Sequence, residues 1–269
     1  MACNQPTKAN IIAAMRWLAE GSAPGDVLFF HFSGHGGQQV DVHGDEEDGM
    51  DETICPLDFS TAGQISDDDL FELLVSPLPA GVRLTCLLDC CHSGHGMDFP
   101  FTLYQDGYGG VAWNADPRVR QDAVADVLLF SGCDDDECSA DATCRYGLPA
   151  GAMTSAFLDA MAELTVPQQA GQQVSSTFLA PASAETQLAA GQLQHDCMHR
   201  VTYPGLLERL QLGLAARGFG QSPQVSSTQP FRLDRSVRLD DVLQISGTSP
   251  LGPIVHVPRP PNLRRAYEG

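Results

Sequence analysis

The stretch that decides the fold is Val82-Arg-Leu-Thr-Cys-Leu-Leu-Asp-Cys-Cys-His-Ser-Gly-His-Gly96. Its first part, residues 83–88, is mostly apolar and predicts a short buried strand that ends in a polar, glycine-containing turn. In open α/β sheets, ligand-binding and catalytic groups gather just beyond the carboxyl ends of the strands. Asp89, Cys90 and Cys91 fall at that point, so we expect a functional site there.

A second stretch has the same design. Residues 27–32, Val-Leu-Phe-Phe-His-Phe, form an apolar run that leads into Ser33-Gly34-His35-Gly36-Gly37. One predicted strand therefore delivers a thiol to a glycine-flanked turn, and the other delivers an imidazole. A lone cysteine or histidine is more often structural, but a cysteine and a histidine that each follow a predicted strand in one chain favour a catalytic pair. If the two strands are neighbours, Cys91 and His35 can act as nucleophile and base.

The composition is that of one acidic domain. At 269 residues, with 43% hydrophobic residues, the chain suffices for a single α/β domain with a substantial core. We expect neither a transmembrane helix nor a secretory signal, because no apolar run approaches ~18 residues and no basic region precedes an apolar stretch at the start. Nine cysteines, with two adjacent, favour reduced thiols in the cytoplasm. The net charge of −19 disfavours nucleic acid and anionic membranes as partners, and we expect a monomer.

The acidic residues are unevenly placed. The sequence has no Lys or Arg between Arg16 and Arg83, whereas Asp and Glu are dense from Asp41 to Glu72. Such a run is usually a solvated face. A block without counter-charges also repels itself in a folded domain, and a bound cation would relieve that repulsion. Both interpretations stay open at this point.

Periodicity and punctuation predict the remaining elements. A helix from about Ala9 to Glu20 can be capped by Thr7 or Asn10, and Ser66 can cap a short acidic helix. Residues 40–63 are expected to be an acidic loop with one extended piece at 53–58, and residues 105–121 an exposed loop. The other expected elements are a strand at 126–131, helices at 154–164 and 204–217, and an extended piece at 224–228.

Several ordered blocks resemble the metacaspases, caspase-like cysteine peptidases of family C14. The blocks that carry the resemblance are Ser33-Gly34-His35-Gly36, Asp89-Cys90-Cys91-His92-Ser93-Gly94, and residues 6–10, 44–49, 131–134 and 151–157. The resemblance covers roughly residues 5–245, and the order of the parts is that of type I. It implies an α/β, caspase-like sandwich in which helices flank a mainly parallel central sheet.

The resemblance also implies a division of the chain. Residues 1–104 would be the large-subunit-like catalytic part, followed by an inter-subunit linker at 105–125. Residues 126–247 would be the small-subunit-like part with a flexible insertion at 165–200, and 248–269 a Pro-rich tail. In the family, a first strand and helix with a pocket Cys and Asp precede the helix expected near Ala9. We expect the fold to be incomplete at the N-terminus, where that segment is missing.

The resemblance assigns roles to the two strand ends. Cys91 would be the nucleophile because it directly precedes His-Ser-Gly, His35 would be the base, and the amides of Cys91 and Gly36 would be the oxyanion donors. Alternation along the strand would point the Cys90 thiol elsewhere. We expect His92 and His31 to be packed structural histidines.

Asp89 and Ser33 would line the pocket for the residue before the scissile bond. A carboxylate there would select Arg or Lys through a forked ion pair. The alternative is that Asp89 only caps the following turn.

Asp51, Asp67, Asp68 and Asp98 match the positions of calcium ligands in the family. Hard oxygen ligands from several loops suit Ca²⁺ and do not suit zinc. The alternative for these residues is the solvated acidic face. Three potential ligands in the insertion, His195, Cys197 and His199, are a much weaker candidate for a metal site.

The sequence therefore predicts a calcium-dependent cysteine endopeptidase that cleaves protein or peptide substrates after Arg or Lys. Self-processing is expected at Arg118 or Arg120, in the linker, with Arg200 as the second choice. The alternative is a catalytically impaired, truncated metacaspase-like protein that binds calcium or partners. An acidic pocket disfavours cleavage after Asp.

Overall fold

The computed structural model describes residues 5–42, 44, 49–90, 96–105, 111–116, 119, 122–132, 141–143, 149–165 and 201–237. Four sequence predictions lie outside these residues: the nucleophile Cys91, the self-cleavage candidates Arg118, Arg120 and Arg200, nearly all of the insertion at 165–200, and the tail at 248–269.

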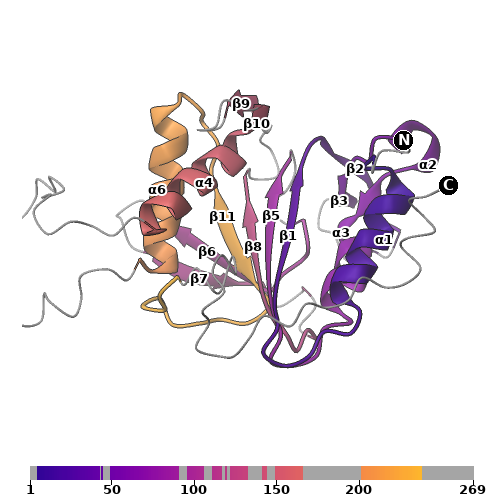
Figure 1. Ribbon diagram of the computed structural model, residues 1–269, viewed down its shortest axis with the longest axis horizontal. Coiled ribbons are helices and arrows are strands. Elements are labelled where there is room, and N and C mark those ends of the chain that lie inside the picture. The colour runs from indigo at the N-terminus through magenta and orange to yellow at the C-terminus, as the bar shows by residue number, and fades with distance from the viewer. Residues whose placement is uncertain are drawn as a thin grey trace, which may run out of the picture.

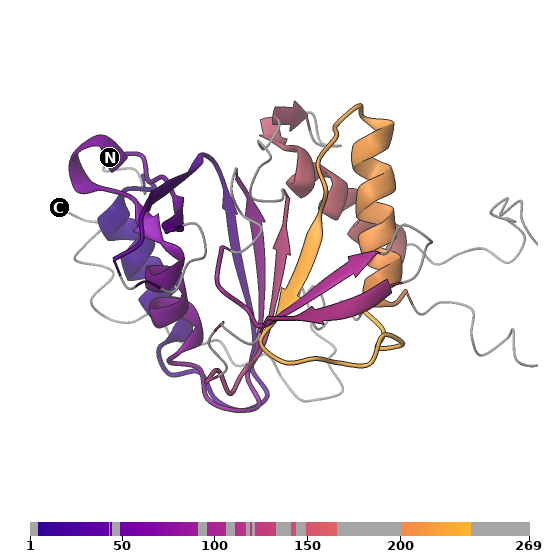
Figure 2. The same ribbon diagram turned by 180° about the vertical axis from the view of Figure 1, so that it is seen from behind.

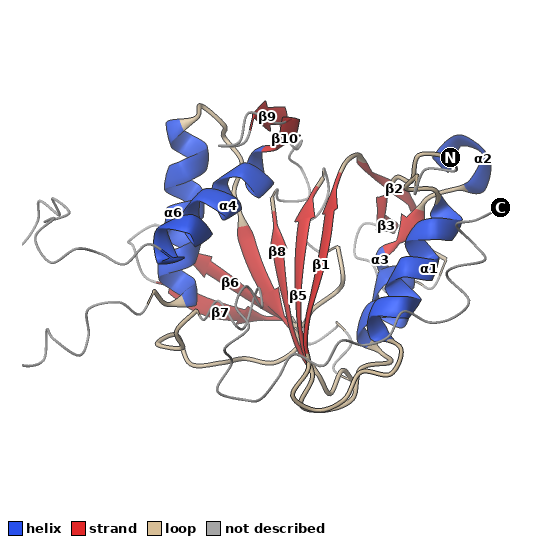
Figure 3. Ribbon diagram, in the orientation of Figure 1, coloured by secondary structure: helices blue, strands red, loops and turns tan. Residues whose placement is uncertain are grey.

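A six-stranded sheet forms the middle of the molecule (Figure 3). Its order is β1-β5-β8-β11-β6-β7, with bounds Val27–Ser33, Arg83–Asp89, Asp126–Ser131, Gln224–Ser227, Phe101–Gln105 and Val111–Ala115. The pairs β1/β5 and β5/β8 are parallel, and the pairs from β8 to β7 are antiparallel. The three strands predicted from apolar runs are therefore neighbours, and their carboxyl ends meet at one edge.

Helices cover both faces of this sheet, as Figures 1 and 2 show from opposite sides. One face carries α1 (Lys8–Ala19), α3 (Asp67–Leu70) and the π-helical turn η1 (Phe71–Val75). The other face carries α4 (Ala152–Thr165) and α6 (Tyr203–Ala216). The structure thus confirms an α/β sandwich in which helices flank a central sheet.

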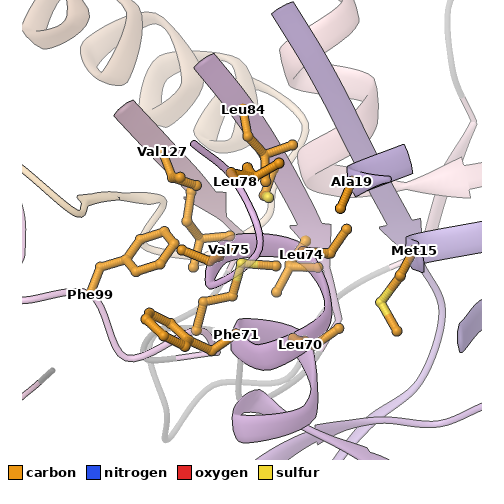
Figure 4. Close-up of a cluster of buried hydrophobic side chains, with 14 of the residues drawn as sticks. Met15, Ala19, Leu70, Phe71, Leu74, Val75, Leu78, Leu84, Phe99 and Val127 are labelled. Atoms are coloured by element: carbon orange, nitrogen blue, oxygen red, sulfur yellow. The ribbon is translucent and has the colours of Figure 1, made fainter. Parts of the chain in front are cut away.

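The alternation of strand residues builds two cores. On one face, Leu84, Cys86 and Leu88 of β5 pack with residues of α1 and η1, as Figure 4 shows for part of the cluster. On the other face, Leu87 of β5 and residues of β8 pack with α4 and α6, where the Phe130 and Phe157 rings meet edge to face at 5.3 Å. Because β5 is buried on both sides, its sequence reads as a continuous apolar run.

The expected helix starts are confirmed. Thr7 caps α1 by accepting from the backbone N–H of Asn10, and Ser66 caps α3 by accepting from Asp69 N at 3.2 Å. A side-chain oxygen at these positions satisfies an amide that has no partner within the helix.

A second, small sheet corrects the expected acidic loop. Strands β2 (Gly36–Val40), β3 (Met50–Ile54) and β4 (Ile65–Ser66) pair antiparallel, with the short helix α2 (Phe59–Ala62) between β3 and β4. The residues of β2 are Gly-Gly-Gln-Gln-Val, which lack the apolar alternation of a half-buried strand. Their strand is stabilised by pairing to β3, and that partner is not visible in a local pattern.

A second correction concerns the expected exposed loop at 105–121. Residues 111–115 form β7, which pairs with β6. The indole of Trp113 donates a hydrogen bond to the Phe231 carbonyl at 2.9 Å, and the two rings meet edge to face at 4.8 Å. The nearby glycines favour a loop, but this contact, between residues more than 100 positions apart in the chain, stabilises the strand.

A short two-stranded sheet, β9 (Asp141–Thr143) with β10 (Pro149–Gly151), leads directly into α4. In Figure 1 it lies near the carboxyl ends of the parallel strands. None of the helices described is long and apolar enough to cross a membrane.

Candidate active site

The two strand-end turns lie side by side. Strands β1 and β5 pair in parallel with Ser33 opposite Asp89, and Gly34 N–H donates to the Asp89 carbonyl at 3.2 Å. His35 follows Ser33 by two residues, and Cys91 follows Asp89 by two residues in the sequence. The register therefore brings the imidazole to the point where the chain leads into the cysteine-bearing turn, whose residues 91–95 lie outside those described.

Two of the other cysteines on β5 and directly after it, Cys86 and Cys90, are buried. Cys90 is 1% exposed and belongs to the core beneath α3 and η1. Cys86 is fully buried, and burial raises the pKa of its thiol far above the ordinary value. A thiol in such surroundings is neither ionised nor accessible, so among this group the position of Cys90 agrees with its exclusion as nucleophile.

His35 is an exposed residue at the end of β1, and its backbone is held from β3. Its carbonyl accepts from Cys55 N at 2.9 Å. In an antiparallel ladder, bonding to the partner alternates along the strand, so the N–H of the next residue, Gly36, is directed away from β3. The role of Gly36 as an oxyanion donor stays a prediction.

A close approach accounts for Gly37. An added Cβ there would lie 2.6 Å from the side-chain oxygen of Gln64, which also accepts hydrogen bonds from Thr53 Oγ1 and from Cys55 Sγ. Gln64 thus lies against Gly37, and a side chain at that position would displace the Gln64 amide from these contacts.

Asp89 and Ser33, the two predicted pocket residues, are direct partners on neighbouring strands. Ser33 is exposed, whereas Asp89 is only 1% exposed. The Asp89 carboxylate accepts from the backbone N–H of Thr154 at 2.6 Å, in the first turn of α4. Asp89 therefore bonds the start of a helix that is distant in sequence, whereas the following turn, which the alternative supposed it to cap, lies outside the described residues.

Two glycines close around the same carboxylate. An added Cβ at Gly151 would overlap Asp89, and one at Gly132 would lie 3.6 Å from Asp89 Oδ1. Sequence reasoning noted the blocks that contain these glycines without linking them to the pocket. Their signal was a glycine three residues before the helix predicted at 154–164 and another immediately after the strand predicted at 126–131.

His31 joins this group from β1. Its Nε2 lies 3.1 Å from Thr154 Oγ1. Although part of the residue is exposed, the protein around the ring removes water and lowers the pKa of His31, and the Asp89 carboxylate opposes this shift by attraction. The expectation of a structural histidine misses that its neighbours are the pocket residues.

Three of the four predicted calcium ligands converge. One carboxylate oxygen each from Asp51, Asp67 and Asp68 lies within 4.8 Å of the others. Asp51 and Asp67 are 3% and 2% exposed. Such burial is unusual for a merely solvated acidic face.

Hydrogen bonds hold the cluster in place. Asp67 accepts from the backbone N–H of Glu52 at 2.8 Å and of Asp68 at 2.7 Å, and Asp51 accepts from the Gln39 amide at 3.0 Å. Oxygen donors of this kind, gathered from β3 and α3, fit a hard divalent cation.

Asp98, the fourth predicted ligand, is not a member of that cluster. It is half-buried and lies shortly after the catalytic turn. Its φ of 48° makes it the one non-glycine residue with positive φ in the described ranges. Aspartate tolerates this conformation better than most residues.

Comparisons with known proteins agree on one family. Residues 1–100 match the domain described as "Metacaspase, peptidase C14 domain". Metacaspase-1 of Cryptococcus neoformans is 41% identical over an alignment of 215 residues. The match covers 64% of this chain and 46% of that protein. Metacaspase-1 of Saccharomyces cerevisiae is 36% identical over 270 residues, 84% of this chain and 54% of that protein. Metacaspase-1 of Arabidopsis thaliana is 44% identical over 162 residues, 58% and 44% of the two chains.

The chain spans about half the length of these relatives. A solved structure, protein GSU0716 from Geobacter sulfurreducens, resembles the fold with a TM-score of 0.50 at 24% identity, covering 89% of this chain and 80% of that one. At that identity it supports the fold alone. The domain match over residues 1–100 and the relatives at 34–44% identity show that this chain is similar to the metacaspases of peptidase family C14.

Proposed function

We propose that this protein is a calcium-dependent cysteine endopeptidase that cleaves after Arg or Lys. The observation that carries the proposal is the β1/β5 register, in which His35 and the turn containing Cys91 follow paired residues of adjacent parallel strands. A nucleophile and base on rigid neighbouring strands need little reorganisation to react.

The proposed chemistry uses the residues at this edge. His35 accepts the thiol proton of Cys91, and the thiolate attacks the carbonyl carbon of the scissile peptide bond. The amides of Gly36 and Cys91 donate to the oxyanion of the tetrahedral intermediate. His35 then protonates the leaving amine, and water hydrolyses the thioester that remains.

The pocket proposal rests on Asp89 and Ser33. The Asp89 carboxylate accepts a hydrogen bond from the start of α4, and a carboxylate in a largely desolvated position favours a guanidinium or ammonium partner. Because Asp89 is buried, a basic side chain would reach it past the exposed residues Ser33 and His31. An acidic side chain would meet repulsion there.

The calcium proposal rests on Asp51, Asp67 and Asp68, which would hold the ion, with Asp98 as a further candidate ligand. The ion would supply positive charge that neutralises these carboxylates. Asp51 lies on β3, the strand whose other end supports His35. Neutralising the cluster would therefore stabilise the strand behind the catalytic base.

The same strand borders the other half of the site. A small cavity is lined by Glu52, Thr53 and Ile54 of β3 together with Cys90 and Gly96. The latter two residues flank the catalytic turn, residues 91–95, so β3 and both ends of that turn border the same cavity. This shared lining supports our proposal that calcium binding fixes the conformation of the catalytic turn.

The experiment is a comparison of matched peptides that carry Arg, Lys or Asp before the scissile bond, with and without millimolar calcium. We expect cleavage of the Arg and Lys peptides only. Asp89→Asn should weaken transition-state binding of the basic peptides by about 1.5–3 kcal/mol, the usual contribution of a hydrogen bond to a charged group. Efficient cleavage after Asp would refute the pocket assignment, and a chain that binds calcium without cleaving any peptide would support the non-catalytic alternative.

A further inference from the structure

We propose that Thr154 and His31 are positioning residues for substrate specificity, which hold the Asp89 carboxylate in the orientation that binds a basic side chain. This inference rests on the proposed function of Asp89. Neither residue would touch the reacting atoms, because both act through Asp89.

The geometry forms a chain of contacts across three elements. Thr154 donates its backbone N–H to Asp89 Oδ2 at 2.6 Å, and its hydroxyl lies 3.1 Å from His31 Nε2. His31 and Ser33 lie on the same face of β1, toward α4, because strand residues alternate. Thr154 is 8% exposed, so its hydroxyl has little access to water and depends on protein partners.

The arrangement needs an external brace because Asp89 sits at the last position of its strand. Its carboxylate is positioned by α4, which belongs to a part of the chain 65 residues later. The Thr154–His31 contact joins the start of α4 back to β1, the strand that carries Ser33 and His35. The contact therefore fixes the distance between the pocket carboxylate and the strand of the catalytic base.

The tightness of the surroundings supports the same role. Gly151 lies directly before α4 and has no room for a Cβ beside Asp89. A small shift of the α4 start would therefore either release the carboxylate or push on it. A contact that anchors that start has a direct effect on the pocket.

The kinetic test uses Thr154→Val and His31→Phe with an Arg peptide. Each change removes one partner of the contact and keeps the size of the side chain. We expect KM to rise about threefold to tenfold, the equivalent of one ordinary hydrogen bond, with kcat changed by less than about twofold. Thr154→Ser keeps the hydroxyl and should restore the wild-type KM.

The matched control is Thr85→Val, the same change at a threonine that is 1% exposed on β5 but lies near the opposite end of the strand. It should leave KM unaltered. The double variant His31→Phe/Thr154→Val should be no worse than either single variant, since one contact is lost in each case. The positioning role would be overturned if the effects of the two single variants added up in the double variant. It would also be overturned if kcat fell by as large a factor as KM rose.

A second readout does not need activity. In a titration of the His31 ring protons by NMR, Asp89→Asn should lower the pKa of His31 further, because the carboxylate is the group that raises it. An unchanged His31 pKa would overturn the inference even if peptides are cleaved. Failure of the wild type to cleave a basic peptide would instead overturn the proposed function and leave this titration to decide the contact.

Discussion

Cys90 and Cys91 are adjacent, yet the side chain of Cys90 is buried in the core. Cys90 packs with Leu88 and Met97 in the cluster beneath η1. We predict that Cys91→Ala abolishes both peptide cleavage and covalent labelling by an Arg-containing electrophile. Cys90→Ala should keep both and lower the free energy of unfolding by on the order of 1 kcal/mol, through loss of packing. Labelling followed by mass spectrometry, with thermal unfolding as the control, separates the two; equal loss of labelling would show the assignment to be wrong.

His31 makes the stability of the fold depend on pH. Its folded-state pKa lies below the ordinary value of 6.5, so in acid the unfolded chain takes up a proton at this residue before the folded protein does. The unfolded state binds more protons in that window, so stability falls as the pH drops from about 6.5 toward the folded pKa. Above 6.5 both states are neutral at His31 and its contribution does not change with pH.

The free energy of unfolding, measured in urea at a series of pH values between about 5 and 7, should fall less steeply toward acid in His31→Phe than in the wild type. The other titrating groups stay in place in both proteins, so only the difference between the curves reports on His31. Identical slopes would contradict the lowered pKa of His31 in the folded protein.

Strand β3 and helix α3 meet through Asp67, whose carboxylate accepts two backbone amides. Removing Asp67 would therefore disturb the backbone as well as an ion site, and Asp68 gives the cleaner variant. We predict weak calcium binding, with Kd on the order of 10⁻⁴ to 10⁻³ M, because few ligands come from one preformed loop. Asp68→Asn should weaken it at least tenfold in isothermal titration.

Asp69 provides the matched control, since it is the next carboxylate along α3 and is not a member of the cluster. Asp69→Asn should bind calcium as the wild type does. Loss of binding in both variants would mean that the overall negative charge attracts the ion and that no specific site exists.

Strand β7 is held to the sheet from a distant segment by the indole of Trp113. Trp113→Phe keeps an aromatic ring against Phe231 but removes the N–H donor. We expect a loss of about 0.5–1.5 kcal/mol in the free energy of unfolding, measured in urea. Leu212→Ala, at a residue 63% exposed on α6, should change it by less than about 0.5 kcal/mol. A wild-type value for Trp113→Phe would argue against this bond.

In our proposal, calcium binding at the acidic cluster triggers self-cleavage in the linker. Without an ion, the acidic residues on β3 and α3 would repel one another, and β3 borders the same cavity as the two residues that flank the catalytic turn. We predict that millimolar calcium, but not magnesium, triggers cleavage near Arg118 or Arg120, with Arg200 as the second choice. Mass spectrometry of the fragments identifies the site.

Two variants serve as controls for this prediction. Arg118→Gln/Arg120→Gln should remove the first cut while peptide cleavage persists, and Asp67→Ala/Asp68→Ala should remove the calcium response. Cleavage that proceeds without calcium, or a response unchanged in the Asp67/Asp68 variant, would contradict the proposed mechanism.

Local pattern determined most of the elements. The apolar runs at 27–32, 83–88 and 126–131 are strands, and Thr7 and Ser66 cap helices as expected. These features depend on neighbours in the chain, namely burial of an apolar run or a side-chain oxygen within reach of a nearby amide, so one sequence suffices to find them.

Only the tertiary structure decided which segments meet. The pairing of β2 with β3, the strand at 111–115, and the contact of Thr154 with Asp89 each depend on residues distant in the chain. A glycine-rich or polar segment becomes a strand when a partner satisfies its backbone, and a carboxylate gains its role from the helix that reaches it. The sequence by itself determined the residue types at the site, and packing between distant segments determined which of them act together.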